Sequence, residues 1–245
     1  MKILVLQHIA IEDPGTLKDL MLADNFELVT IELDQGEKIP ENLDDFDGML
    51  CMGGPMDTWM EAEYPWLVQE KEKIKHYVKT LEKPFIGFCL GAQLLGEVVG
   101  GQVVQSNPSE IGVLDVNLSN DRKNDLLFEK FPEVIKSVQW HSYEVCGLDN
   151  TPEVTVLGHS PVTRYQIFRY KKHAYGIQFH IEVRPTTVQD WGDIAEYKQA
   201  LENTLGANAL NEFDTQAKQH MSAMNHHAAL LYNGFKQLLA NTSKS

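Results

Sequence analysis

The sequence predicts an α/β fold with a doubly wound, mostly parallel sheet and helices on both of its faces. Strand-like and helix-like segments alternate through the first two-thirds of the chain, which is the pattern of β-α-β units. The apolar run at residues 3–6 is continuous, as expected for a strand that is buried on both faces. From about residue 102 to 180, short strand-like segments follow one another, which predicts extra and partly antiparallel strands at one side of the sheet.

The individual elements follow from periodicity and from glycine and proline punctuation. Strands are expected at 2–7, 26–33, 47–52 and 84–88, then at 102–105, 112–118, 137–140, 154–159, 165–170 and 174–179. Helices are expected at 16–24, 64–81 and 90–99. Residues 186–240 are predicted to be mostly helical, with a break near Gly206. The architecture is flavodoxin-like, with one domain at 1–190 and a helical C-terminal extension at 191–245 packed on it. The last five residues are expected to fray.

Length, charge and hydropathy exclude several classes of partner and of cellular location. The chain has 245 residues, which suits one compact α/β domain. Its formal net charge of −14 opposes binding to nucleic acid and to acidic membrane surfaces, so we expect neither partner. No apolar run reaches the roughly 18 to 20 residues of a membrane span, and the N-terminus is expected to be a strand rather than a secretory signal. We therefore expect a cytoplasmic protein.

The chain has three widely spaced cysteines, Cys51, Cys89 and Cys146, and no CxxC motif. This pattern predicts neither a disulfide framework nor a structural zinc site, and we expect no metal and no cofactor. A single cysteine in such a chain is a candidate nucleophile, and its neighbours decide which one it is. Cys51 lies within an apolar strand and is expected to belong to the core.

Cys89 has the surroundings of a nucleophile. A short strand ends at Phe88, a helix begins at Leu90, and Gly87 and Gly91 lie two residues to either side of the cysteine. This is the nucleophile-elbow pattern with cysteine in place of serine. The helix N-terminus supplies free amide groups and partial positive charge, which favour a thiolate. The backbone N–H of Leu90 is then placed to stabilise an oxyanion.

A base and a group that orients it follow later in the chain. His180 and Glu182 are two residues apart in a segment of alternating pattern, so their side chains are expected on one face. A carboxylate there can hold one imidazole nitrogen and leave the other to face the thiol. Seven other histidines, His8 among them, lack such a context.

At these residues the chain resembles the triad-type, or class I, glutamine amidotransferases, and in particular stand-alone members akin to the amidotransferase domain of GMP synthetase. The resemblance covers about residues 1–190 and rests on three motifs, 53–56 (GGPM), 87–93 (GFCLGAQ) and 180–182 (HIE). It implies that Cys89 attacks the γ-carboxamide of glutamine, releasing ammonia and leaving a glutamyl thioester that water hydrolyses. It also implies that His180 is the acid and base and that Glu182 orients it.

The resemblance also implies the surroundings of the nucleophile. Gly53 and Gly54 match the oxyanion loop of the family. Gly54 is therefore expected to be an oxyanion donor together with Leu90, and Gly53 is expected to bind the substrate. Gln93 is expected to contact the α-amino acid end of the substrate, although without the family a solvent-facing polar residue explains it equally well. The further substrate-binding residues that the resemblance implies are His141, Ser142 and Tyr143.

The sequence departs from the family at two positions. Ile181 replaces the proline that usually stands between the histidine and the glutamate, and it keeps an extended preference. Tyr143 stands where the family often has aspartate, which leaves the identity of the substrate open.

Several functions stay open at this point. The leading hypothesis is cysteine-dependent hydrolysis of glutamine, which releases glutamate and ammonia. The chain contains no P-loop of the GxxxxGK[ST] type, so a possible synthase partner would be a separate subunit. An alternative is an independent hydrolase of γ-glutamyl peptides or conjugates. A non-catalytic regulatory protein on the same scaffold and a thiol redox sensor are further alternatives. The helical extension could cover a sheet edge, cap the site or form a homodimer.

Overall fold

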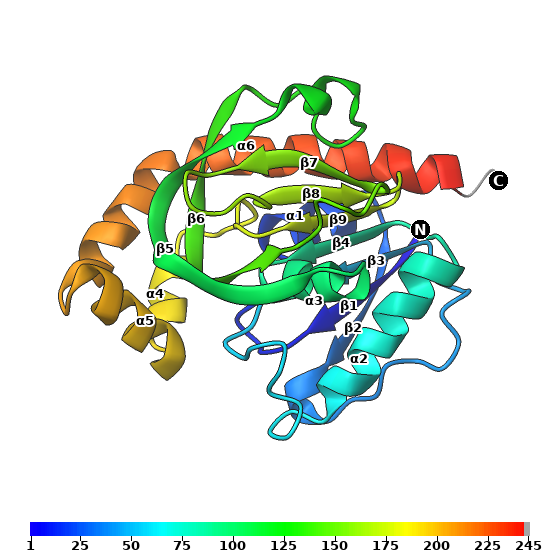
Figure 1. Cartoon of the computed structure of the whole chain (residues 1–245), viewed down its shortest axis with the longest axis horizontal. Coiled ribbons are helices and arrows are strands. Elements are labelled where there is room, and N and C mark those ends of the chain that lie inside the picture. The colour runs from blue at the N-terminus through cyan, green and yellow to red at the C-terminus, as the bar shows by residue number, and fades with distance from the viewer. Residues whose placement is uncertain (243–245) are drawn as a thin grey trace.

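The computed structural model describes residues 1–242 and contains one nine-stranded sheet in the order β2-β1-β3-β4-β9-β8-β7-β5-β6. Figure 1 shows the strands with the helices around them. The strands are β1 (Lys2–Gln7), β2 (Glu27–Glu32), β3 (Gly48–Cys51), β4 (Phe85–Phe88), β5 (Gln102–Leu118), β6 (Val134–Cys146), β7 (Val154–His159), β8 (Ile167–Tyr170) and β9 (Ala174–Ile177). The α-helices are α1 (Gly15–Ala23), α2 (Trp66–Lys75), α3 (Leu90–Val98), α4 (Thr187–Gly192), α5 (Ala195–Leu205) and α6 (Ala209–Thr242).

The sheet is mixed, with a parallel part and an antiparallel part. Strands β2, β1, β3, β4 and β9 pair in parallel, and the remaining strands join them through antiparallel pairs. The α/β fold with extra antiparallel strands and C-terminal helices is therefore confirmed. Because parallel strands end at the same edge, the segments that follow β1, β3, β4 and β9 are brought close together.

The core lies on both faces of the sheet. Along β1, Ile3 and Val5 face one hydrophobic cluster, and Leu4 and Leu6 face the other. This alternation is the two-residue period of a strand, and the absence of polar residues from it explains why the run looks continuous in the sequence. Helices α1 and α6 cover the first face, and α2 and α3 cover the second (Figure 1).

Several expected elements change length. The helix expected over 64–81 becomes α2 followed by a π-helical turn, η2 (His76–Thr80). The separate strand segments at 102–105 and 112–118 are parts of the long strand β5, whose pairing with β6 shifts register between Gln105 and Glu110. Residues 1–242 also contain two 3-10 turns, η1 (Leu33–Gln35) and η3 (Asn120–Asn124).

The C-terminal helices lie against the sheet. Helix α5 ends at Leu205, Gly206 follows with a positive φ of 94°, and α6 begins at Ala209, so the predicted break near Gly206 is confirmed. Helix α6 continues through Thr242, which places Asn241 and Thr242 in a helix instead of the frayed tail expected there. Residues 243–245 lie outside the described part of the chain. The division into 1–190 and 191–245 stays a prediction.

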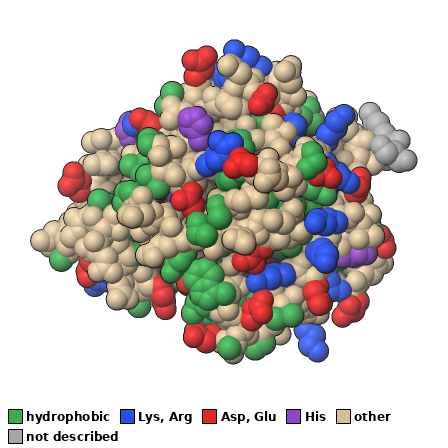
Figure 2. All heavy atoms as spheres, viewed as in Figure 1, with side chains coloured by type: hydrophobic (Ala, Val, Ile, Leu, Met, Phe, Trp, Pro, Cys, Tyr) green, Lys and Arg blue, Asp and Glu red, His purple; other side chains and the backbone are tan. Residues whose placement is uncertain are grey.

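Within residues 1–242, no helix has both the length and the apolar character that a membrane-spanning segment needs. On the face seen in Figure 2, acidic side chains are spread widely and interspersed with basic ones.

Candidate active site

Cys89 occupies a strained turn between β4 and α3. Its φ of 46° and ψ of −103° are a backbone conformation that residues with a Cβ rarely adopt. Both flanking glycines are required by close packing. A Cβ on Gly87 would lie 2.3 Å from the carbonyl oxygen of Gly91, and one on Gly91 would lie 2.1 Å from that of Cys51. The predicted elbow is thus present, with Cys89 at the N-terminal end of α3.

His180 and Glu182 follow β9 and lie beside Cys89. The Nδ1 atom of His180 is 2.5 Å from Oε1 of Glu182, and the backbone N–H of Ile181 donates to the other carboxylate oxygen at 2.9 Å. The backbone of His180 pairs with Val138 of β6. The indole of Trp191 packs edge-on against the imidazole at 4.6 Å. The structure therefore brings the three residues of the predicted triad together.

The electrostatics of His180 favour its charged form. Burial by itself would lower the pKa of His180, but the charge of Glu182 and hydrogen bonds with Cys89 and Glu182 outweigh that effect, so its pKa is well above 6.5. The imidazole of His180 also forms a hydrogen bond with the side chain of Cys89.

Cys89 opens on a cavity of about 390 Å³. Predicted site residues Gly54, Leu90 and Gln93 line it, and so do His141, Ser142 and Tyr143. Gly53, which was expected to bind substrate, is buried and does not line this cavity. Helix α5 forms another part of the wall with Glu196, Tyr197, Gln199, Ala200 and Asn203. A larger hollow of about 500 Å³ lies between β5 and the start of α6, but none of the predicted site residues lines it.

The predicted substrate-binding side chains are held by hydrogen bonds. Gln93 is buried, so the solvent-facing alternative for it is wrong, and its amide donates to the carbonyl oxygen of Tyr143 at 3.1 Å. The two nitrogens of His141 lie 3.0 Å from that carbonyl and 2.9 Å from Oε1 of Gln139. Burial lowers the pKa of His141 to about 4, against the charge of Glu110 and the bond to Tyr143, which raise it. Ser142 accepts a bond from Ser109 at 3.1 Å.

Comparison with known proteins identifies the family of this chain. The family described as Glutamine amidotransferase class-I matches residues 18–191, which is most of the chain. The chain belongs to this family. Membership implies glutamine hydrolysis through a cysteine.

Relatives of this class I amidotransferase include the glutamine amidotransferase-like protein YfeJ of Salmonella typhimurium, which is 32% identical over 70% of each chain. One component of the glutamine-hydrolysing GMP synthase of Sulfolobus acidocaldarius is 30% identical over 61% of this chain and 74% of its own. A crystal structure of a glutamine amidotransferase from Thermotoga maritima is 28% identical, covers 98% of both chains and superposes with a TM-score of 0.83. The resemblance inferred from the motifs is confirmed.

Sequence reasoning missed part of the site of this amidotransferase. The hydroxyl of Tyr197 on α5 donates to the buried carboxylate of Glu12, and the indole N–H of Trp140 donates to the carbonyl of Tyr197 at 3.1 Å. Gln178 donates from its amide to Sγ of Cys89 at 3.5 Å. Glu12 follows β1 at the same sheet edge as the elbow, and this position was the available signal. Trp191 and Tyr197 looked like ordinary apolar positions of a helix.

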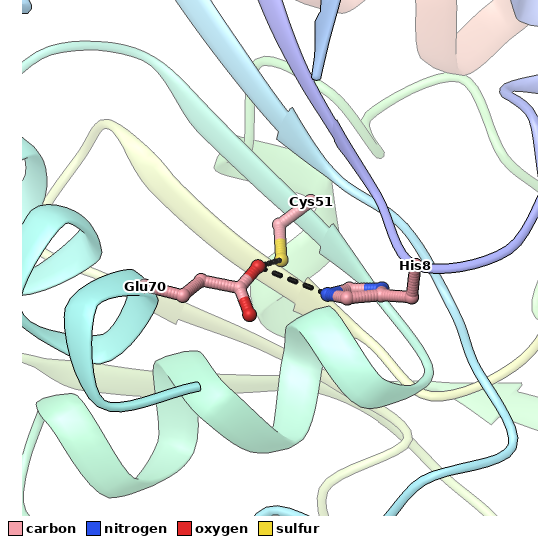
Figure 3. Close-up of side chains that lie close together, drawn as sticks. All are labelled: His8, Cys51 and Glu70. Atoms are coloured by element: carbon pink, nitrogen blue, oxygen red, sulfur yellow. Dashed lines mark hydrogen bonds and ion pairs between the residues drawn. The ribbon is translucent and has the colours of Figure 1, made fainter. Parts of the chain in front are cut away.

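A second cysteine lies in a different setting, shown in Figure 3. Cys51, His8 and Glu70 are all fully buried, and the thiol of Cys51 donates to Oε1 of Glu70 at 3.3 Å. These are the residue types of a cysteine triad. However, burial and the adjacent charge of Glu70 raise the pKa of Cys51 well above 9, which favours its protonated, less nucleophilic form. His8, which seemed to lack context in the sequence, is part of a buried polar cluster.

The same cluster contains donor types that bind metal ions, with its candidate ligand atoms within 4.8 Å of one another. A structural zinc site needs four ligands, and the cluster offers three. Hydrogen bonds already join Oε1 of Glu70 to the other two side chains. The arrangement fits a hydrogen-bonded cluster better than a metal centre.

Proposed function

We propose that this protein hydrolyses the γ-carboxamide of glutamine, with Cys89 as nucleophile, His180 as acid and base, and Glu182 as the residue that orients His180. The observation that supports it most is the bonded His180–Glu182 pair beside a cysteine in a strained elbow that opens on a cavity. Family membership supports the same chemistry.

The reaction would proceed in two steps. The thiolate of Cys89 attacks the γ-carbonyl carbon, and the amides of Gly54 and Leu90 stabilise the oxyanion that forms. The carbon–nitrogen bond breaks as His180 gives its proton to the departing nitrogen, which leaves as ammonia. His180, now neutral, takes a proton from water, and the hydroxide attacks the thioester to release glutamate and restore the thiol.

The test is ammonia release from glutamine by the purified protein, with Cys89→Ser and Cys146→Ser as a matched pair. Cys89→Ser removes the thiolate and little volume, so we expect loss of turnover on the order of 10³-fold or more with unchanged circular dichroism. Cys146→Ser, at the end of β6, should behave as the wild type. A glutamine-analogue electrophile should label Cys89 and spare the buried Cys51. Turnover that survives in Cys89→Ser would overturn the assignment.

A second substrate class has one observation in its favour. The cavity beside Cys89 has about 390 Å³, within the range of about 300–1,000 Å³ of pockets that hold drug-sized ligands. The helix α5 side, with Gln199 and Asn203, offers room for a substituent on the amide nitrogen. This space favours γ-glutamyl peptides or conjugates as substrates.

Substitution of Asn203 distinguishes the two classes. Asn203 is exposed on α5, so Asn203→Trp can fill this part of the cavity without disturbing the core. If the substituent binds there, kcat/KM for γ-glutamyl peptides should fall roughly tenfold or more while glutamine stays within about twofold. Asn208→Trp, which lies outside the cavity, is the control. An equal loss for glutamine and peptides would remove the support for the second class.

The fate of the ammonia depends on a partner. The relative from Sulfolobus acidocaldarius is one component of a synthase, which suggests that this chain also docks on a synthase partner. A wild type that is slow alone and stimulated by a co-purifying protein would support this arrangement. A homodimer is a separate prediction, and sedimentation of the purified protein tests it.

A further inference from the structure

The buried cluster in Figure 3 touches the loop that is expected to stabilise the oxyanion. His8 follows β1, Gly53 follows β3, and Glu70 comes from α2. Strands β1 and β3 are parallel neighbours, so the residues after them meet at one edge of the sheet. The Nδ1 atom of His8 lies 2.9 Å from the carbonyl oxygen of Gly53, and its Nε2 atom lies 2.9 Å from Oε1 of Glu70.

These contacts fix the hydrogen atoms on His8. A carbonyl oxygen only accepts, so Nδ1 must carry a hydrogen. Glu70 holds the other nitrogen, and the indole of Trp66 stacks on the ring at 5.5 Å with an angle of 25° between the planes. Burial alone would lower the pKa of His8, but the charge of Glu70 and the bonds to Glu70 and Gly53 outweigh it and raise that pKa. The imidazole of His8, which donates to Gly53, is therefore fixed in position and orientation by Glu70 and Trp66.

The peptide between Gly53 and Gly54 needs such a partner. Two successive glycines lack Cβ atoms, so the local backbone restrains this peptide plane less than other residues would. In a trans peptide the carbonyl and the following N–H point in opposite directions. Holding the carbonyl oxygen of Gly53 toward His8 therefore directs the N–H of Gly54 away from the cluster. Gly54 lines the cavity with Cys89.

We propose that His8, held by Glu70, is a positioning residue that locks the Gly53–Gly54 peptide with its N–H toward the oxyanion formed at Cys89. The inference rests on the proposed hydrolysis and deepens it, since it assigns a purpose to buried charges that the triad does not use.

Two substitutions of His8 separate its two contacts. The amide nitrogen of asparagine takes the place of Nδ1, so His8→Asn keeps a donor for Gly53 and gives up Glu70. Glutamine reaches the place of Nε2, so His8→Gln keeps a partner for Glu70 and gives up Gly53. Both variants remove the ring and its charge, so the general cost to folding is matched between them.

We expect His8→Gln to lower kcat for glutamine by about 100-fold, the effect of losing one oxyanion donor, with KM within about twofold. His8→Asn should retain kcat within about tenfold of the wild type. Alkylation of Cys89 by iodoacetamide, a displacement that forms no oxyanion, should keep the same rate in both. Equal losses of kcat that follow a common fall in melting temperature would overturn the proposal, because they indicate a purely structural role.

Two further measurements do not depend on turnover. A crystal structure of His8→Gln should show the Gly53–Gly54 peptide reoriented, and an unchanged peptide would overturn the inference even if the wild type proved inactive on glutamine. Elemental analysis of the purified wild type should find no stoichiometric metal; one metal ion per chain, lost in both variants, would replace the positioning role by a metal site. If the wild type releases no ammonia from any γ-glutamyl amide but the peptide is reoriented in His8→Gln, only the proposed function is refuted.

Discussion

At the scale of single residues, the two buried cysteines of this protein differ in what surrounds the sulfur. Cys51 donates to Glu70 in a fully enclosed cluster, and its pKa is raised by burial and by that carboxylate. Cys89 lies beside an imidazole whose positive charge is stabilised, and it faces a cavity. Both cysteines are largely shielded from solvent, so overall exposure does not distinguish them. Their expected difference in reactivity follows from the neighbouring groups and from the access that the cavity gives to Cys89.

Glu182 sets the charge of His180, so its substitution should change the pH profile. The pKa of His180 is raised, so its imidazolium persists as pH rises past 6.5 and is lost only when pH passes the raised value. In Glu182→Gln the raising charge is gone, burial dominates, and the imidazolium is lost at a lower pH. We expect the alkaline limb of kcat/KM to move to lower pH and kcat at neutral pH to fall on the order of 100-fold.

The measurement is kcat/KM for glutamine from pH 5 to 10, with Glu202→Gln as the control, because Glu202 is exposed on α5. An unchanged profile in Glu182→Gln would contradict the role of this carboxylate in setting the charge of His180.

At the scale of elements, helix α5 is attached to the catalytic edge through its first turn. Tyr197 bonds to Glu12 through its hydroxyl and accepts from Trp140 through its carbonyl. Burial raises the pKa of Glu12, and the charge of His180 and the bond from Tyr197 offset that only in part. The helix thus contributes to the wall of the cavity and to the environment of His180 at the same time.

Removal of the Tyr197 hydroxyl tests this attachment. Tyr197→Phe leaves a buried carboxyl oxygen of Glu12 without its donor, which should cost about 1–3 kcal/mol of the free energy of unfolding. In a chain of this size each kcal/mol lowers the melting temperature by about 2–4 °C.

Tyr232→Phe is the matched control. The hydroxyl of Tyr232 donates to Asp24 at 2.7 Å, and the side chain of Asp24 is 42% exposed. Water can replace that bond, so its loss should cost less than about 1 kcal/mol. Equal shifts in melting temperature for the two variants would mean that the Glu12 contact adds nothing specific.

At the scale of the whole molecule, helix α6 joins the C-terminal residues to the core of the sheet. Leu231 is fully buried in the hydrophobic cluster that also contains Ile3 and Val5 of β1. We therefore propose that the described part of the C-terminal extension, residues 191–242, is packed on the same domain as 1–190 and unfolds with it.

Leu231→Ala tests that proposal. The substitution should cost about 2–5 kcal/mol and shift one single unfolding transition. Leu205→Ala, the same change at a side chain that is 50% exposed, should stay within about 0.5 kcal/mol of the wild type. Two transitions by calorimetry, with only one displaced in Leu231→Ala, would indicate that the C-terminal helices are a separate unit.

The sequence by itself determined the fold class and the family, and it predicted that Cys89, His180 and Glu182 act together. These depend on local chemistry, namely the periodicity of buried strands, glycines on both sides of a turn, and a histidine two residues before a carboxylate. The elbow could be predicted because its backbone excludes a Cβ at Gly87 and Gly91, a constraint that is visible in one short segment.

Only the tertiary structure decided what lies around that triad. Glu12, His8 and Glu70 are far from Cys89 in the sequence. His8 and Glu12 follow β1, whose neighbour in the sheet is β3, and Glu70 reaches His8 from helix α2. The same holds for Tyr197, whose hydroxyl finds its partner 185 residues away. Burial turns such residues into strong hydrogen-bonding partners, and burial is a property of the folded chain as a whole.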